Sequence, residues 1–182
     1  MVRPVELIPL VCLKCDTPVP AQPDEVAWVC ARCGQGLLLN ESDARGLSPL
    51  VVQYAAGLDP ARPGKPFWVA EGSVQLQRST YAALSDKDGE ARQLWSQPRR
   101  FFIPAYEVPL QTLADLGPRL VLSPPALQAG PPAPFEPVTV SPEDLPALAE
   151  FIVLAIEAGR SDMLKQVQIQ VRLSEPVLWV LP

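Results

Sequence analysis

The chain has 182 residues, of which 48% are hydrophobic and 19% are charged, so its composition is that of a globular protein and not of a disordered one. Its formal net charge of −5 has the wrong sign for a protein that mainly neutralises phosphate groups. The absence of histidine excludes Ser-His-Asp and Cys-His catalysis, and 23 prolines predict many short strands and turns.

The first residues are expected to form an extended lead-in and not a targeting segment. Residues 1–11 are too short for a signal peptide and are interrupted by Pro4, Glu6 and Pro9. No stretch of the sequence approaches the roughly 18 consecutive apolar residues of a membrane span. We therefore expect a cytoplasmic protein without a membrane span.

Four cysteines form the most specific motif of the sequence: Cys12, Cys15, Cys30 and Cys33. Two Cys-x-x-Cys pairs at this separation can supply four thiolates to one tetrahedral metal ion. Four ligands leave no open position for water or substrate, so we expect structural Zn²⁺, with iron as the alternative metal. Gly34 follows the second pair and would let the backbone pass close to the metal, whereas Asp16 occupies the corresponding position after the first pair.

The pattern Cys12-x2-Cys15-x14-Cys30-x2-Cys33-Gly34, with Trp28 two residues before the third cysteine, resembles a zinc ribbon. The resemblance covers only residues 10–38 and implies a metal-stapled module over residues 1–40. It implies metal binding but no particular function, because zinc ribbons occur in transcription factors, ribosomal proteins, polymerase subunits and structural appendages. A polar, turn-forming segment places the domain boundary near residues 40–48, before a second domain over residues 48–182.

The first half of the second domain is predicted to be a set of short strands. Residues 50–56 predict one strand, and residues 67–83 predict two strands around Glu71-Gly72, because polar and apolar residues alternate there. Residues 85–90 predict a hairpin turn, and the return strand is expected to begin at Leu94-Trp95.

The central part of the chain is dominated by proline. Residues 99–110 predict an edge or bulged strand, because a central strand does not tolerate their two prolines. Residues 112–116 predict a single helical turn and residues 120–122 a strand. Residues 123–137 contain six prolines and predict a stiff linker or wrapping arm of polyproline character.

One main helix is predicted over about residues 143–160. Ser141 is a suitable N-cap, and Pro142 fits the first turn. The expected solvent-exposed stripe consists of Glu143, Glu150 and Glu157; carboxylates seven residues apart lie about 10 Å apart on a helix, too far to share one metal or proton. The rest of the helix is apolar enough to be buried on more than one side.

The last residues predict two strands. Residues 167–173 alternate between apolar and polar side chains, residues 174–176 predict a turn, and residues 177–181 are apolar throughout, as in a central strand. The predicted architecture is α+β: an N-terminal zinc ribbon followed by a mostly antiparallel sheet with one main helix.

Two functions compete for this architecture. The first is a non-enzymatic interaction or assembly protein that binds a protein partner or a second copy of itself; it fits the closed metal site, the apolar helix and the lack of catalytic groups. The second is a nucleic-acid-binding protein of transcription or translation. Its basic and aromatic patch would comprise Arg92, Trp95, Arg99, Arg100, Phe101 and Phe102. Adjacent Phe101 and Phe102 would point to opposite faces of a strand, and the acidic net charge opposes phosphate binding.

Overall fold

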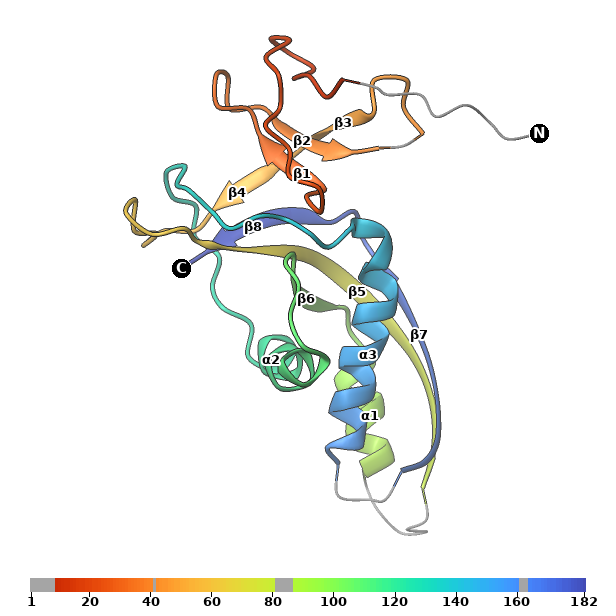
Figure 1. Cartoon of the computed structure of the whole chain (residues 1–182). Coiled ribbons are helices and arrows are strands. Elements are labelled where there is room, and N and C mark those ends of the chain that lie inside the picture. Colours follow the sequence, from red (N-terminus) through yellow and green to blue (C-terminus); the bar gives the residue numbers. More distant parts are fainter. Residues whose placement is uncertain (1–8, 41, 81–86, 161–163) are drawn as a thin grey trace, which may run out of the picture.

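A computed structural model of the chain describes residues 9–40, 42–80, 87–160 and 164–182. Within them, two sheets and three α-helices form an α+β fold, which confirms the predicted fold class (Figure 1). The elements are β1 (Ala27–Val29), β2 (Gly36–Leu39), β3 (Leu47–Leu50), β4 (Val52–Tyr54), β5 (Lys65–Thr80), α1 (Lys87–Trp95), β6 (Arg99–Pro104), α2 (Leu110–Leu122), α3 (Leu145–Ala158), β7 (Leu164–Leu173) and β8 (Val177–Leu181). No helix in this part of the chain is long and apolar enough to cross a membrane.

The small sheet is antiparallel, in the order β1-β2-β3, and it carries the cysteine motif at its end. Only Val51 separates β3 from β4, which pairs in parallel with β8 in the large sheet. The strand predicted over residues 50–56 is therefore divided between the two sheets. The small sheet extends to Leu50, so its last strand lies at and beyond the boundary placed near residues 40–48.

The large sheet has the order β4-β8-β5-β6, with β7 also paired to β5. Its longest strand, β5, is continuous over 16 residues, so the predicted break at Glu71-Gly72 is wrong. Gly72 serves close packing instead of a turn: a Cβ at this position would lie 2.6 Å from Cε2 of Phe101. A glycine inside a strand has this second use, which the sequence pattern alone does not distinguish from a turn.

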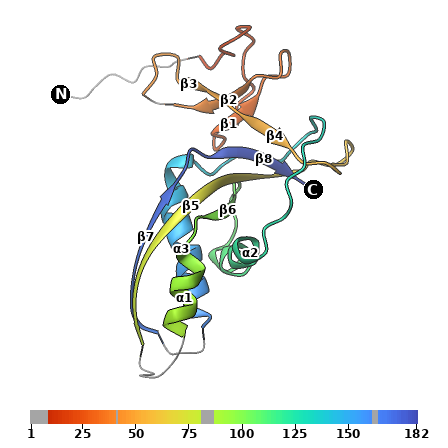
Figure 2. The same ribbon diagram turned by 180° about the vertical axis from the view of Figure 1, so that it is seen from behind.

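β7 and β8 follow each other along the same edge of β5 (Figure 2). Gly72 pairs with Leu173 and Val69 pairs with Val177, so the intervening residues 174–176 oppose one residue fewer on β5. The turn predicted there is wrong, because the chain keeps its direction through a β-bulge. The Ser174 N–H donates to the Glu71 carbonyl over 2.8 Å and holds the bulge against β5.

Two helices replace predicted turns and strands. The hairpin turn predicted at residues 85–90 lies partly outside the described residues, and from Lys87 onward the chain is helical to Trp95, so the strand start at Leu94-Trp95 is wrong.

α2 has 13 residues and replaces the predicted single turn and the strand at 120–122. Its buried residues Leu113, Gly117 and Val121 are four apart and lie on one face. The helix continues through Pro118, which lacks the N–H that would bond the carbonyl four residues earlier.

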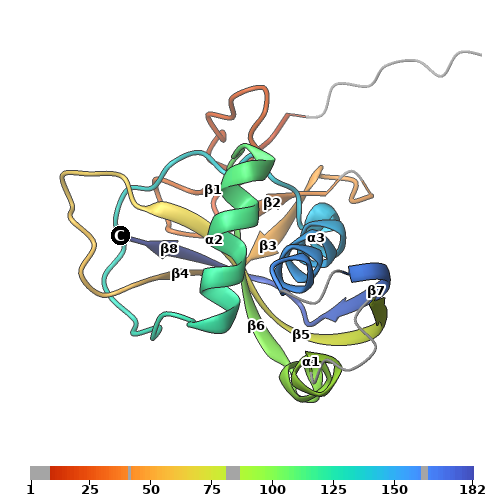
Figure 3. The same cartoon turned by 90° about the horizontal axis from the view of Figure 1, so that it is seen from below.

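Hydrophobic clusters lie on both faces of the large sheet. The main cluster joins Trp68, Phe101 and Ile103 to residues of all three helices. Figure 3, a view from below, shows α2 in front of the strands, with α3 and α1 to one side of it. On the opposite face, Phe67 and Phe102 belong to a second cluster, to which α2 also contributes. Phe101 and Phe102 therefore point to opposite faces, as the sequence predicted.

Of the two forms predicted for the proline-rich segment, a linker or a wrapping arm, the structure shows a wrapping arm, which passes between the small and large sheets (Figure 1). Ala129 pairs with Ala55, and the arm then reaches the edge of β1, where the Val26 N–H donates to the Val138 carbonyl over 2.8 Å. Ala27 of β1 is only 3% exposed and belongs to the main hydrophobic cluster. The two sheets consequently share one core.

α3 covers the range predicted for the main helix, apart from its ends. A 3-10 turn over Pro142–Asp144 precedes it, and the Ser141 hydroxyl caps this turn by accepting from the Glu143 N–H over 3.2 Å. The predicted solvent-exposed stripe is only partly correct. Glu143 is exposed, Glu150 is half-buried, and Glu157 is completely buried.

Candidate metal centre

Two matching backbone turns present the cysteines. In the first turn, the Asp16 N–H donates to the Cys12 carbonyl over 3.0 Å and the Cys12 N–H donates to the Thr17 carbonyl over 2.9 Å. The second turn has the same two hydrogen bonds: the Gly34 N–H donates to the Cys30 carbonyl, and the Cys30 N–H donates to the Gln35 carbonyl, each over 2.9 Å. The short spacing of each pair thus folds into the same knuckle twice.

Both knuckles need a left-handed backbone residue after their second cysteine. Gly34 has φ 73° and Asp16 has φ 53°, the one positive φ outside glycine among the described residues. Aspartate is among the few residues with a side chain that adopt this conformation readily. The left-handed residue therefore occurs in both knuckles, although only one of them has glycine there. The Asp16 carboxylate is also bound by Arg45, over 2.9 Å.

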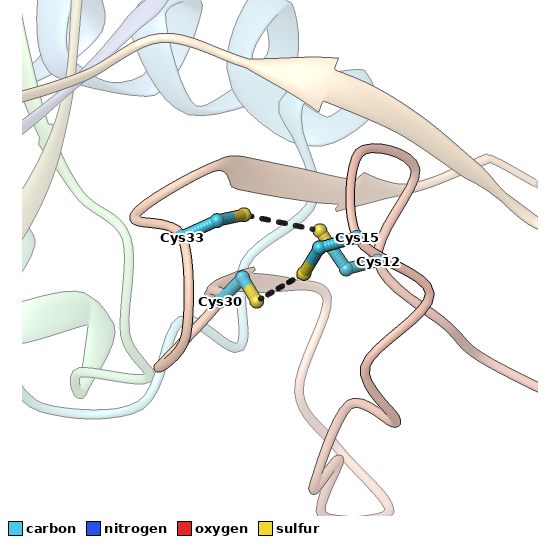
Figure 4. Close-up of side chains that lie close together, drawn as sticks. All are labelled: Cys12, Cys15, Cys30 and Cys33. Atoms are coloured by element: carbon cyan, nitrogen blue, oxygen red, sulfur yellow. Dashed lines mark hydrogen bonds between the residues drawn. The ribbon is translucent and has the colours of Figure 1, made fainter.

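The structure brings the four cysteine sulfurs into one cluster (Figure 4). All four Sγ atoms lie within 4.8 Å of one another; Cys12 and Cys33 are 3.5 Å apart, and Cys15 and Cys30 are 3.6 Å apart. Four sulfurs bound tetrahedrally at about 2.3 Å from zinc would be about 3.8 Å apart, so the cluster fits such an ion. The closest contacts are far longer than the S–S bond of about 2.0 Å, and the cysteines are free thiols.

The cluster is sealed by protein on one side. Cys12 and Cys30 are buried, whereas Cys15 and Cys33 are half-buried. Leu37, Leu47 and Trp28 pack around the cysteines in a small core separate from the main one. The indole N–H of Trp28 donates to the Glu25 carboxylate over 2.7 Å, so the polar end of this buried ring is satisfied.

The thiols of the cluster differ in acidity. The Thr17 hydroxyl and backbone N–H lower the pKa of Cys15 to about 6. The backbone N–H of Cys33 lowers the pKa of Cys30. The Gln35 backbone N–H acts in the same direction on Cys33, but burial and the three neighbouring sulfurs outweigh it and raise its pKa to about 12. Four thiolates this close repel one another, and a divalent cation would compensate for that repulsion.

The basic and aromatic patch considered from the sequence does not form a stacking platform. Trp95, Phe101 and Phe102 are each at most 7% exposed, so their rings are not presented to bases. Arg100 binds the Glu71 carboxylate over 2.8 Å, and the Nε of Arg99 donates to the Leu94 carbonyl over 3.0 Å.

A buried charge network, which the sequence pattern does not predict, is centred on Glu157. Its Oε1 accepts from the Trp95 indole over 2.8 Å, and its Oε2 lies 2.9 Å from Nε of Arg160 and 3.4 Å from Nε of Arg78. The network ties α3 to α1 and β5. Its heptad spacing from Glu143 and Glu150 had placed Glu157 with the solvent-exposed residues, and no local signal corrects that placement.

Comparison of the chain with protein-family models, with curated proteins and with solved structures finds no match.

Proposed function

We propose that the protein is a non-enzymatic zinc-binding interaction protein, in which a structural zinc ribbon is fused to an α+β domain that binds a protein partner. The observation that carries the proposal is the four-sulfur cluster, whose Sγ atoms all lie within 4.8 Å of one another. Cys12, Cys15, Cys30 and Cys33 would hold the ion, and a four-thiolate set favours zinc over the harder cations.

The zinc ion would have a structural role. A four-cysteine set closes the tetrahedron and leaves no position for water or substrate. Zinc binding to such modules supplies about 10–16 kcal/mol, which a sheet of three short strands needs in place of a large hydrophobic core. Since the small and large sheets share a core through Ala27 and Val138, the ion would also hold the surface between them in a fixed shape.

Two features support an interaction role over catalysis. The chain contains no histidine, and all four cysteines belong to the proposed metal site, so the commonest general base and the thiol nucleophile are both missing. Large apolar side chains are also exposed: Val51 by 60%, Leu110 by 63% and Leu122 by 51%. Reduced cysteines further fit a cytoplasmic location.

Nucleic-acid binding is the weaker proposal. The net charge is −5, and the aromatic side chains of the candidate patch are buried. Electrostatic attraction to phosphate provides most of the affinity of non-specific nucleic-acid binders, and it is steeply salt-dependent. A mobility shift at low salt that disappears when Arg99 and Arg100 are neutralised would revive this function.

The metal assignment is tested by elemental analysis of the purified protein. We expect one zinc per chain, which is lost when Cys12 and Cys30 are both replaced by serine. Iron in place of zinc, or no metal in freshly purified protein, would contradict the assignment.

The interaction role is tested by the mass of the intact complex isolated gently from the protein's own cells. We expect the chain within a larger assembly of defined stoichiometry. A monomer without companions, at the concentrations found in cells, would contradict the proposed role and leave the zinc assignment in place.

A further inference from the structure

Two neighbouring hollows that share Glu136 and Pro137 in their lining lie along the proline-rich arm. The first, of about 670 Å³, is lined by Trp28, Tyr54 and Phe135 together with several prolines of the arm. The second, of about 560 Å³, adjoins it at Glu136 and Pro137. We call the two hollows together the arm groove, and each hollow is one half of it.

The walls of the arm groove are held in place by backbone hydrogen bonds. The Gly64 N–H donates to the Pro134 carbonyl over 2.8 Å, and the Glu136 N–H donates back to the Gly64 carbonyl over 2.9 Å. Between Pro137 and Thr139, which line the second half, the Val138 carbonyl accepts from the N–H of Val26, the residue before β1, over 2.8 Å. A binding site that exists before its ligand arrives avoids the entropy cost of ordering loops.

The first half is apolar, and its wall offers acceptors more than donors. Pro132, Pro134 and Pro137 have no N–H, so their backbone can only accept hydrogen bonds. The indole N–H of Trp28 is already bonded to Glu25. An occupant would therefore bring apolar side chains together with its own hydrogen-bond donors.

The second half is acidic. Its carboxylates belong to Asp24, Glu107, Glu136 and Asp144. Lys65 forms an ion pair with Glu136, and its Nζ lies 5.1 Å from the ring centroid of Tyr106. The lysine therefore offsets the charge of Glu136. Asp24, Glu107 and Asp144 are exposed, and the ion pairs of the described residues leave these three carboxylates to solvent.

We propose that the arm groove binds an extended segment of a protein partner in which apolar residues adjoin lysine or arginine. The apolar side chains would lie between Trp28, Tyr54 and the arm, and the basic side chains would face Asp24, Glu107 and Asp144. This charge complementarity selects a cationic segment and rejects nucleic acid, whose phosphates the acidic half repels. The inference deepens the proposed interaction function and rests on it.

The test is a selection of random dodecapeptides on the immobilised, zinc-loaded, full-length protein. Enriched peptides are then synthesised, and their affinities are measured by fluorescence anisotropy. We expect peptides with a net positive charge next to apolar residues. Three variants probe the groove: Asp24→Lys and Glu107→Lys in the acidic half, and Pro132→Arg in the apolar half. Asp115→Lys on α2 makes the same charge change away from the groove, at an exposed position.

Each charge reversal in the groove should weaken peptide binding by about five- to tenfold, whereas Asp115→Lys should change the affinity less than twofold. Pro132→Arg should weaken it as well, by filling the apolar half. Enrichment of acidic peptides, or of none, overturns the inference.

Two further results would also overturn the inference without touching the proposed function. One is tight peptide binding that all three groove variants leave unchanged, because the partner surface would then lie elsewhere. The other is a concentration-dependent dimer in sedimentation that Pro132→Arg abolishes, because the groove would then hold a second copy of this chain. Failure of the proposed function itself would show separately, as a solitary monomer in the intact-mass experiment.

Discussion

At the scale of single residues, the surroundings decide what identical side chains do. Cys15 and Cys33 both close a Cys-x-x-Cys pair, but the Thr17 hydroxyl favours the thiolate of Cys15, whereas burial and neighbouring sulfurs favour the thiol of Cys33. Glu150 and Glu157 lie two turns apart on α3. Glu150 accepts a hydrogen bond from the edge of β7 over 3.4 Å, and Glu157 is enclosed between two arginines and a tryptophan.

The acidity of the thiols predicts how zinc binding depends on pH. At pH 7.5 the Cys33 thiol of the metal-free protein is protonated, because its pKa is raised to about 12, while Cys15, with a pKa of about 6, is largely ionised. Zinc binding should therefore release protons, but fewer than four per ion. Affinity should fall as the pH falls, and more steeply below pH 6, where Cys15 also takes up a proton.

Calorimetric titration of the metal-free protein with zinc, in two buffers of different ionisation enthalpy, measures the number of protons released. The Cys33→Ser variant is the control and should release fewer protons than the unaltered protein. Equal heats in both buffers would contradict the prediction, because no proton would then leave the site.

The buried network predicts a large effect of removing Glu157. The Arg78 side chain is only 5% exposed and that of Arg160 only 13%. Glu157→Ala would remove the one fully buried carboxylate that both arginines contact, and it would leave them the more exposed Asp88 and Glu90, each 3.4 Å away. We expect a loss of about 3–5 kcal/mol in the free energy of unfolding. Glu150→Ala, on the same helix, should lose about 1 kcal/mol, the value of its single hydrogen bond.

Urea unfolding followed by tryptophan fluorescence compares the two glutamate variants directly. Similar losses for both would show that Glu157 is not the centre of a buried network.

At the scale of elements, close packing explains where regular structure persists against the sequence signals. The Phe101 ring occupies the space that a Cβ at position 72 would need, so glycine fits there and β5 continues without a break. α2 continues through Pro118 because its face of Leu113, Gly117 and Val121 is buried. In both cases tertiary contacts override a local preference for a break.

The crossing of α2 and α3 depends on Gly117. A Cβ on Gly117 would lie 2.5 Å from Cγ1 of Ile152, which is fully buried. Gly117→Ala should therefore cost about 1–3 kcal/mol of stability through overpacking, although alanine favours a helix. Gly159→Ala is the matched control: φ is −72° and the nearest atom to its Cβ would be 3.4 Å away, so no loss is expected.

Thermal unfolding of both glycine variants measures the difference. Combining Gly117→Ala with Ile152→Val should recover a small part of the loss, because valine lacks the Cδ1 atom, 2.9 Å from the added Cβ, but keeps the nearer Cγ1. A Gly117→Ala variant as stable as Gly159→Ala would show that the helices can separate without cost.

At the scale of the whole molecule, the small sheet packs into the main hydrophobic core and is not a separately packed module. Ala27 lies in the main cluster, and Leu38 and Leu50 of β2 and β3 pack against it. Val51 is the single residue between β3 and β4, and its carbonyl accepts from the Leu178 N–H over 3.3 Å. Damage at the cysteines should therefore reach the large sheet.

Removal of zinc by a chelator should destabilise the entire chain. We expect one cooperative thermal transition that shifts to lower temperature by tens of degrees, because a loss of about 1 kcal/mol lowers Tm by about 2–4 °C in a chain of this size and zinc supplies about 10–16 kcal/mol. Hydrogen exchange should speed up in β4 and near Val138 as well as at the cysteines. Changes confined to residues 12–36, with the transition of the large sheet unmoved, would instead indicate a separable ribbon.

The sequence by itself determined the features that depend on spacing between near neighbours. The cysteine spacing identified all four members of the sulfur cluster, alternation identified β7, and the apolar run identified β8. These patterns are readable because ligand geometry and the strand period act over a few residues. The α+β class followed from them.

Only the tertiary structure decided which residues meet across long separations. It made β5 one strand, kept α2 helical, buried Glu157 and joined Ala27 to Val138. Each outcome depends on a partner far away in the sequence: Phe101 for Gly72, Ile152 for Gly117, and Arg78 for Glu157. Local pattern carries no information about such partners, because burial is a property of the packed molecule and not of the segment.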